Sequence, residues 1–291
     1  MKFAAIDIGS NAVRLLVSQV LDIDGETYFQ KVSFTRVPIR LGEDVFDKGK
    51  ISDKKIKSLV RTMRAFWYLM DVQEVIDFRA CATSAMREAS NGKAVIEQIK
   101  EQANVDINLI SGAEEADLIF GNFWHQKIDK KKNYLYVDVG GGSTELSIIK
   151  RGKRVKAKSF KIGTVRALKN KVKSSAWSDI KEWVKEELKE ENKLTGIGTG
   201  GNINRLYKMS SCKMNAPLTL QELKSLNDMV RSHSWEERIS ELRLKPDRAD
   251  VIVHAAEIYI KTMELAGVKK MIVPRVGLSD GIIIDLFKKH S

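Results

Sequence analysis

The sequence has little of what would place it outside the ordinary globular class. Its 291 residues include only two cysteines and four prolines, which excludes a disulfide framework, a four-thiolate metal site and a collagen-type repeat. No apolar run approaches the ~18 residues of a membrane helix; the longest candidate, Val251–Ile260, contains His254 and Glu257. Asp7 interrupts the apolar N-terminus before a signal peptide could form. We therefore expect a soluble cytoplasmic protein with no membrane partner.

Several catalytic signatures are also missing. The sequence has no Gly-x-x-x-x-Gly-Lys-Ser/Thr loop, no Gly-x-Gly-x-x-Gly fingerprint, no Gly-x-Ser-x-Gly elbow and no His-Glu-x-x-His pair. The four histidines show no metal-ligand spacing. These absences disfavour P-loop, Rossmann, serine hydrolase and zinc protease chemistry.

Positive charge is abundant but unevenly spread. With 43% hydrophobic and 30% charged residues the chain is not a disordered tail, and 50 Lys+Arg against 38 Asp+Glu give a net charge of +12. The stretch Leu146–Ser178 contains eleven bases and no acid, so it supplies nearly all of that net charge. Such a local field attracts phosphate-rich ligands, nucleic acid or acidic lipid. The alternative is a solvated face that serves solubility alone.

Two segments of the sequence resemble each other. Phe3–Val17 resembles Leu135–Ile149, with Asp7 paired with Asp138 and Gly9 with Gly140 at an offset of 131 residues. Each segment is an apolar strand ending in Asp, a small-residue turn and a second apolar strand. A repeat of this period indicates a duplicated domain. We place the boundary in the polar run 124–133, which predicts domains 1–124 and 125–291, with a C-terminal helix 281–291 that packs back on the first domain.

Hydrophobic periodicity predicts helices and strands in both halves. Ser52 begins a helix whose apolar positions recur at three- and four-residue intervals as far as Met70. Further strands are expected at Val75–Ala80, Ile107–Ile110, Thr195–Gly198 and Lys270–Val273, and further helices at Ser178–Glu191, Asn202–Met209, Thr219–Arg231 and Arg248–Ala266. This mixture favours an α/β fold with a central sheet in each half.

The two repeated turns are candidate phosphate sites. Glycine allows the backbone to approach an anion and leaves its amides open. A lone glycine turn is common in hairpins, but two related copies with an acid in register favour a phosphate site. Hydroxyl or amide donors flank the turns at Ser10, Asn11, Ser143 and Thr144. Carboxylates that could bind Mg²⁺ beside phosphate lie at Asp7, Asp138 and Glu145.

Two further residues are candidates for chemistry. In Ser111-Gly-Ala-Glu-Glu, Ser111 and Glu114 fit a capping box, which leaves Glu115 about 100° further round the helix. Glu115 is therefore the candidate base that takes a proton from an attacking water, although acids at helix N-termini are also stabilising by themselves. Arg87 is expected in the first turn of a helix, where it opposes the helix dipole, so we interpret it as a phosphate ligand.

With these residues assembled, the chain resembles the exopolyphosphatase / guanosine-pentaphosphate phosphohydrolase family in its short two-domain form. The resemblance covers nearly the whole chain and rests on five motifs in order: Asp7-Ile-Gly-Ser-Asn-Ala-Val-Arg-Leu, Ala82-Thr-Ser-Ala-Met-Arg-Glu-Ala-Ser-Asn, Ile110-Ser-Gly-Ala-Glu-Glu-Ala, Asp138-Val-Gly-Gly-Gly-Ser-Thr-Glu and Gly198-Thr-Gly-Gly-Asn. It implies two ribonuclease-H-like domains of the actin, sugar-kinase and heat-shock-chaperone ATPase superfamily, around an interdomain cleft.

The resemblance also implies roles for individual residues. Glu115 would activate water, and Asp138 and Glu145 would hold Mg²⁺, with Mn²⁺ as a substitute. Phosphate oxygens would be bound by Asn11, Arg14, Arg87, Gly141, Gly142, Ser143 and Thr144, with Arg248 as a weaker match. The family often has serine at the position of Ala12, and proline at that of His254.

The function that follows is Mg²⁺-dependent hydrolysis of the terminal phosphoanhydride of inorganic polyphosphate, with release of orthophosphate. One alternative is hydrolysis of guanosine pentaphosphate. Others are a sugar or acid kinase on the same fold, and a catalytically weak nucleotide or polyphosphate sensor. Nucleic acid is disfavoured as a partner because Leu146–Ser178 contains only two aromatic residues, Phe160 and Trp177, for stacking. A second copy of the chain, as a homodimer, is a further candidate partner.

Overall fold

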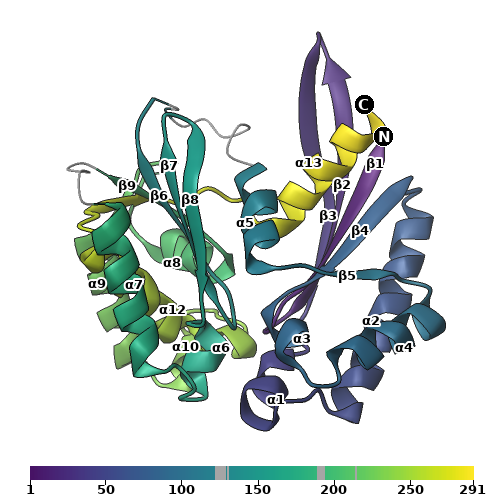
Figure 1. The fold of residues 1–291 in the computed structure, drawn as a ribbon, viewed down its shortest axis with the longest axis horizontal. Helices are drawn as coiled ribbons and strands as arrows, with labels where there is room; N and C mark the ends of the chain where they lie inside the picture. Colours follow the sequence, from purple (N-terminus) through teal and green to yellow (C-terminus); the bar gives the residue numbers. More distant parts are fainter. Residues whose placement is uncertain (122–128, 130, 189–193, 214) are drawn as a thin grey trace. The chain divides into compact units, whose positions relative to one another are not determined.

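The chain divides into two compact units in the computed structural model, which describes residues 1–121, 129, 131–188, 194–213 and 215–291 (Figure 1). Unit 1 comprises Met1–Phe123 and Gly277–Ser291, and unit 2 comprises Trp124–Val276. The boundary predicted at residues 124 and 125 and the end of the helix predicted to reach Glu191 lie outside the described residues.

Unit 1 is built on a five-stranded sheet with the order β3-β2-β1-β4-β5. The first three strands are antiparallel neighbours, and β4 and β5 run parallel to β1. The strands are β1 (Lys2–Ile8), β2 (Val13–Ile23), β3 (Glu26–Val37), β4 (Asp77–Ala82) and β5 (Ile107–Leu109).

The helices of unit 1 cover both faces of this sheet. They are α1 (Leu41–Lys48), α2 (Asp53–Val72), α3 (Ser84–Glu88), α4 (Gly92–Ala103), α5 (Gly112–Gly121) and α13 (Leu278–His290). Figure 1 shows α13 and α5 on one face and α2 and α4 on the other. The helix predicted from Ser52 is confirmed as α2, with the predicted apolar stripe buried except for Trp67, which is half buried.

The C-terminal helix α13 packs on β1 and β4. The rings of His290 and Phe3 are 5.3 Å apart, and the carboxylate of Asp285 accepts a hydrogen bond of 3.1 Å from Arg79 of β4. Arg79 also donates to Glu114, at the start of α5, over 2.6 Å. The end of the chain is therefore connected, through Arg79, to the helix that carries Glu115.

Unit 2 repeats the same sheet with one additional edge strand. Its order is β10-β11-β9-β6-β7-β8, in which β6, β7 and β8 are antiparallel and β9 and β11 run parallel to β6. The strands are β6 (Tyr134–Val139), β7 (Thr144–Lys150), β8 (Lys153–Phe160), β9 (Thr195–Thr199), β10 (Leu218–Thr219) and β11 (Lys270–Ile272). This is the ribonuclease-H-like strand order, and the predicted fold class is confirmed.

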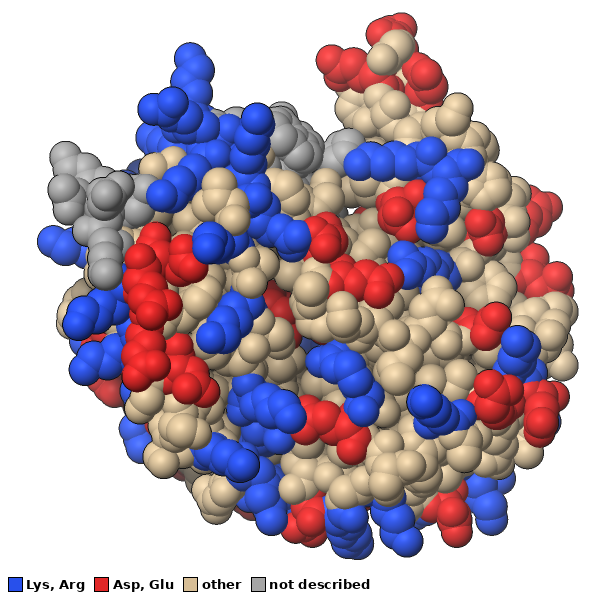
Figure 2. All heavy atoms as spheres, in the orientation of Figure 1, with Lys and Arg blue, Asp and Glu red and all other residues tan. Residues whose placement is uncertain are grey.

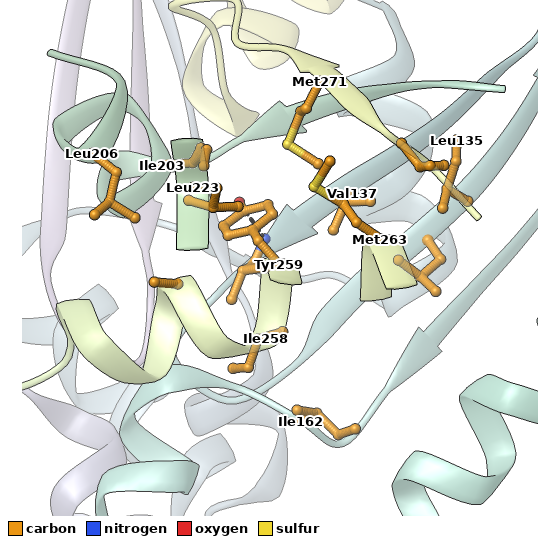
Figure 3. Close-up of a cluster of buried hydrophobic side chains, with 14 of the residues drawn as sticks. Leu135, Val137, Ile162, Ile203, Leu206, Leu223, Ile258, Tyr259, Met263 and Met271 are labelled. Atoms are coloured by element: carbon orange, nitrogen blue, oxygen red, sulfur yellow. Dashed lines mark hydrogen bonds between the residues drawn. The ribbon is translucent and has the colours of Figure 1, made fainter. Parts of the chain in front are cut away.

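The helices of unit 2 enclose its hydrophobic core. They are α6 (Thr164–Leu168), α7 (Ser174–Glu187), α8 (Gly201–Met209), α9 (Leu220–Ser232), α10 (Trp235–Ser240), α11 (Pro246–Ala249) and α12 (Ile252–Leu265). Leu135 and Val137 of β6 pack there against Ile203 of α8 and Tyr259 and Met263 of α12 (Figure 3).

Two predicted helix boundaries in unit 2 were wrong. The helix expected from Ser178 begins one turn earlier, at Ser174, with Lys173 as its N-cap residue. The helix expected over Arg248–Ala266 begins at Pro246 and is divided into α11 and α12. Proline is favoured at the first position of a helix because its missing N–H is not needed there. At the division, Val251 N–H donates over 3.1 Å to the carbonyl of Arg248, which is three residues earlier rather than the four of an α-helix.

Candidate phosphate and metal site

The turn between β1 and β2 brings an acid and a base face to face. Asp7 and Arg14 are direct partners in the antiparallel pair, and the Arg14 guanidinium forms an ion pair with the Asp7 carboxylate. The turn is closed by a hydrogen bond of 3.1 Å from Gly9 N–H to the Ala12 carbonyl. Because the guanidinium already neutralises Asp7, this pair does not support the prediction that Asp7 is a metal ligand.

The turn between β6 and β7 has the same backbone geometry with different charges. Gly140 N–H donates to the Ser143 carbonyl over 2.9 Å, as Gly9 does three residues ahead of Ala12. The partner of Asp138 across the pair is Glu145, which is 2% exposed. Two carboxylates directly opposite one another repel unless a cation lies between them, and their oxygens are the ligands that Mg²⁺ prefers.

The orientation of both carboxylates is fixed by hydroxyl groups. The Thr199 hydroxyl donates to Asp138 Oδ1 over 2.7 Å, and the Ser159 hydroxyl donates to Glu145 Oε1 over 2.9 Å. Thr199 is the register partner of Asp138 on β9, and Ser159 is that of Glu145 on β8. Hydroxyl donors beside ligating carboxylates are typical supports of a metal site, so these residues fit a divalent cation.

Helix α6 binds the carbonyl groups of the second turn. Thr164 N–H donates to the Gly140 carbonyl (3.0 Å), and Val165 N–H to the Gly141 carbonyl (2.8 Å). The Arg166 guanidinium, which is almost fully buried, donates to the Gly142 carbonyl over 2.8 Å. A trans peptide points its carbonyl and the next N–H in opposite directions. The amides of residues 141, 142 and 143 are therefore turned away from α6, in the arrangement that binds anions.

Gly163 makes this contact possible. A Cβ atom at that position would lie 2.4 Å from the Gly142 carbonyl carbon and 2.5 Å from the Gly141 carbonyl oxygen. Only a residue without a side chain allows α6 to approach the turn so closely.

The first turn is supported in the same way by the segment that enters α1. Gly42 N–H donates to the Ser10 carbonyl (2.8 Å) and Arg40 N–H to the Asn11 carbonyl (3.0 Å). The amides of Asn11 and Ala12 are therefore directed away from α1. Ser10 itself is buried, and its hydroxyl shares a hydrogen bond of 2.9 Å with the Ser84 hydroxyl.

Tyr259 connects the second turn to a third glycine cluster, Gly196-Ile-Gly-Thr-Gly-Gly, at the junction of β9 and α8. Its hydroxyl donates to the Thr199 carbonyl and accepts from Val139 N–H over 3.2 Å. Burial, and then the nearby charge of Asp138, raise the pKa of this phenol well above its ordinary value. The hydroxyl therefore stays protonated and able to donate at physiological pH.

The candidate base Glu115 lies at the N-terminal end of α5 in unit 1. It is 8% exposed, and its N–H donates to the Ser111 carbonyl over 2.9 Å. Its neighbour Glu114 accepts the Arg79 guanidinium with its side chain, while the Ser111 hydroxyl accepts from Glu114 N–H over 3.1 Å. The capping interaction predicted for Ser111 is thus present, but the carboxylate of Glu114 binds Arg79 rather than the helix's own amide.

Two predicted phosphate ligands, Arg87 and Thr144, are hydrogen-bonded within their units, and a third, Arg248, lies beside Gly201. Arg87 lies in the last turn of the five-residue α3, so the helix-dipole argument for it was wrong; its guanidinium donates to the Ile110 carbonyl over 2.6 Å. Thr144 is fully buried and its hydroxyl donates to the Ile162 carbonyl over 2.6 Å, which fixes the start of β7. The guanidinium of Arg248 lies beside Gly201 of the third glycine cluster, and a Cβ atom on Gly201 would be 2.9 Å from it.

The residues that support the second turn were not predicted as site residues. Gly163, Arg166 and Tyr259 lie in none of the five motifs, and Thr199 lies in the Gly198-Thr-Gly-Gly-Asn motif but was assigned no role. Arg166 is one of the eleven bases of the acid-free stretch, and only the structure shows that it is buried and bonded to the turn.

The basic stretch also divides between two faces of the sheet. Residues directly opposite in an antiparallel pair share a face. Lys156 and Lys158, the partners of Ile148 and Leu146, therefore lie on the face whose apolar residues pack in the core with the helices. There Lys156 pairs with Glu187 over 3.1 Å. Arg154 is the partner of Ile149, which shares its face with Glu145. Figure 2 shows lysine and arginine side chains gathered at the end of the β7–β8 hairpin.

Both units have the ribonuclease-H-like strand order, and the second turn combines two facing carboxylates with backbone amides turned away from α6. The chain belongs to the Ppx/GppA phosphatase family, because the model of that family matches residues 19–290. The family prediction made from the sequence motifs is therefore confirmed.

Individual relatives support the same assignment. The guanosine-5'-triphosphate,3'-diphosphate pyrophosphatase of Aliivibrio fischeri (strain MJ11) is 28% identical over 294 residues, which cover 96% of this chain and 58% of that protein. Exopolyphosphatase 1 of Mycobacterium tuberculosis (strain H37Rv) is 22% identical over 304 residues, covering 98% and 88% of the two chains. The crystal structure of the Aquifex aeolicus Ppx/GppA family member superposes with a TM-score of 0.77 at 26% identity, covering 100% and 99% of the two chains. The chain thus spans less than two thirds of the Aliivibrio relative. Among the described residues, no helix is both long and apolar enough to cross a membrane.

Proposed function

We propose that the protein hydrolyses the terminal phosphoanhydride of inorganic polyphosphate and releases orthophosphate. The observation that carries this proposal is the second turn, where Asp138 and Glu145 face each other beside three amides turned away from α6. A divalent cation would neutralise phosphate charge, and the amides would bind its oxygens. Phosphoryl transfer requires such positioning and charge stabilisation, with little covalent chemistry from the protein.

The residues have separate roles in this proposal. Asp138 and Glu145 would hold Mg²⁺ or Mn²⁺, which stabilises the developing charge on the phosphoryl group when bound. Gly141, Gly142 and Ser143 would bind phosphate oxygens through their backbone, as would Asn11, Arg14, Arg87 and Arg248 through side chains. Glu115 would take the proton of the attacking water.

The substrate class is supported by charge. The acid-free stretch of unit 2 includes β8, whose Arg154 lies on the same face of the sheet as Glu145, and the tip of the β7–β8 hairpin carries Lys150, Arg151 and Lys153. A long polyanion gains from these further bases, whereas a short one gains less. Guanosine pentaphosphate is the second candidate, because a relative matching 96% of this chain is named for that chemistry. One assay separates them: phosphate release from long polyphosphate, tripolyphosphate and guanosine pentaphosphate, each with and without Mg²⁺.

The role of Glu115 is tested by Glu115→Gln. The amide keeps the size of the side chain but cannot accept a proton, so turnover should fall about 10²–10⁴-fold while substrate binding stays near wild type. The matched control is Glu114→Gln, which changes the adjacent acid bound to Arg79 and should leave most of the activity. Retained activity in Glu115→Gln would remove Glu115 from the mechanism.

We also propose that the protein acts in the cytoplasm and forms a homodimer, and that its first domain is residues 1–124 with the C-terminal helix packed on it, while the second domain begins at residue 125. Size-exclusion chromatography with light scattering measures the oligomeric state directly.

A further inference from the structure

Strands β6 and β9 separate at the point where the candidate metal ligand lies. They run parallel, and Asp138 with Thr199 forms their last register pair. Beyond this pair the chain from β6 enters the Gly140 turn, and the chain from β9 enters Gly200 and the start of α8. The two glycine turns therefore begin at one fork in the sheet.

The hydroxyl of Tyr259 lies in this fork. It accepts a hydrogen bond of 3.2 Å from Val139 N–H on one strand and donates to the Thr199 carbonyl on the other. In an uninterrupted parallel ladder, such backbone groups would bond to the neighbouring strand itself. The phenol thus replaces a backbone hydrogen bond at the position where the strands part.

The position of that hydroxyl is fixed by the core. Tyr259 is fully buried, and its ring on α12 packs in the cluster that includes Val137, Ile203 and Met263 (Figure 3). Close-packed side chains have little freedom to move. Helix α12 therefore sets the separation of the two strand ends.

The same fork orients Asp138. The Thr199 hydroxyl donates to Asp138 Oδ1 over 2.7 Å. Gly200 has a positive φ of 113°, and a Cβ atom there would lie 3.3 Å from Asp138 Oδ1 and 3.5 Å from the Tyr259 hydroxyl. Carboxylate, threonine, glycine and phenol thus share one closely packed space.

We propose that Tyr259 is a positioning residue for the metal site: its hydroxyl holds the fork between β6 and β9 so that Thr199 presents Asp138 to the divalent cation. This inference rests on the proposed function, because that proposal makes Asp138 a metal ligand. Residues that orient a ligand typically change metal affinity by 10–100-fold when they are altered.

The test is Mn²⁺ binding to the full chain, measured by isothermal titration calorimetry without substrate. Tyr259→Phe keeps the ring and removes the hydroxyl, and Thr199→Val removes the donor to Asp138; each should weaken Mn²⁺ binding about tenfold. Thr199→Ser keeps the donor and should bind within about twofold of wild type. The double variant Tyr259→Phe/Thr199→Val should lose less than the sum of the two, because both act through one network.

A matched control lies at the other end of the same strand. Tyr134 begins β6, is 1% exposed, and its hydroxyl donates to the Asp129 carbonyl over 2.8 Å. Tyr134→Phe removes the hydroxyl of another buried tyrosine, far along the strand from Asp138, so its Mn²⁺ affinity should equal that of wild type. Circular dichroism confirms that each variant is folded before titration.

Wild-type Mn²⁺ affinity in a folded Tyr259→Phe would overturn the inference, and so would an equal loss in Tyr134→Phe. If Tyr259→Phe does not fold, hydrogen exchange of the wild type decides: Val139 N–H should be strongly protected by the phenol, and fast exchange would contradict the proposal. The proposed hydrolysis fails separately, if wild type binds Mn²⁺ in this pattern but releases phosphate from none of the three substrates.

Discussion

The two glycine turns are copies of one backbone design with opposite electrostatics. In both, a glycine N–H donates to the carbonyl three residues later, and a following helical segment binds the carbonyl groups from behind. The residues that lie side by side on three neighbouring strands at this level of the sheet differ. They are Cys81, Asp7 and Arg14 in unit 1, and Thr199, Asp138 and Glu145 in unit 2.

That difference changes what each turn can bind. In unit 1 the acid is neutralised by Arg14, so we expect this turn to bind phosphate without a metal. In unit 2 two acids face each other and each receives a hydroxyl donor, which suits a cation. In the proposed function, both copies offer backbone amides to an anion, and the residue opposite the aspartate determines whether a metal joins it.

The hairpins that follow the turns differ as well. The β2–β3 hairpin has acids at its tip, at Asp22, Asp24 and Glu26, and the β7–β8 hairpin has bases, at Lys150, Arg151 and Lys153. Figure 2 shows the two tips in opposite colours. A polyanion is therefore attracted to the hairpin of unit 2 and repelled by that of unit 1.

The largest expected effect comes from neutralising one acid in each turn. Glu145→Gln removes a ligand of the proposed cation, so phosphate release should fall about 10³-fold. Asp7→Asn leaves the proposed cation in place and only deprives Arg14 of its partner, so the loss should be about tenfold. Steady-state phosphate release at saturating Mg²⁺ gives both values. Equal losses of phosphate release in the two variants would show that the two turns do not differ in metal binding.

The next effect concerns the glycines that let a helix approach each turn. Gly163→Ala places Cβ against backbone at 2.4–2.5 Å, whereas Gly42→Ala meets the flexible Phe46 ring at 2.7 Å and Ser10 Cβ at 3.0 Å. Overpacking against backbone cannot be relieved by a rotamer change, so Gly163→Ala should cost about 1–3 kcal/mol of unfolding free energy and Gly42→Ala less. Urea denaturation measures both, and the reverse order would contradict the geometry.

A smaller effect is expected on the third strand of unit 2. Arg154 lies on the face of Glu145, and Lys156 on the opposite face. Arg154→Gln should raise the KM for long polyphosphate about three- to tenfold, an effect that high salt weakens, and leave that for tripolyphosphate nearly unchanged. Lys156→Gln is the matched control and should change neither. If both variants behave like wild type, the basic stretch serves solubility only.

The smallest effect involves Cys81, the neighbour of Asp7. Burial, opposed by Arg79, raises the pKa of this thiol from 9.0 to about 12. The pKa of the thiol is higher in the folded state than in the unfolded state. Its contribution to the free energy of unfolding is therefore complete below pH 9 and is lost as the pH rises toward 12. Unfolding free energy should fall by about 1 kcal/mol between pH 8 and pH 10. Cys81→Ala should remove that part of the pH dependence, whereas Cys212→Ala should retain it.

The sequence predicted the elements that follow local rules. The repeated Asp-to-glycine turns, the helix from Ser52 and the family itself were visible because strand ends, glycine and helical spacing are local properties. The division of α11 from α12 coincides with an i to i+3 hydrogen bond from Val251 N–H to the Arg248 carbonyl, which no spacing rule detects.

Only the residues of the site that lie within the second turn and its motif could be predicted from the sequence. Asp138, Glu145 and the glycines lie within one motif, but their supports, Thr199, Ser159 and Tyr259, come from three other elements. The pairing of Asp7 with Arg14 was also hidden, because it depends on which residues the antiparallel register brings opposite each other.

Mn²⁺ binding to wild type, Asp7→Asn and Glu145→Gln tests the division between the two turns most directly. Isothermal titration should find one site in wild type and in Asp7→Asn, and loss of that site in Glu145→Gln. A variant Asp7→Asn that no longer binds Mn²⁺, beside a Glu145→Gln that binds it normally, would contradict the account.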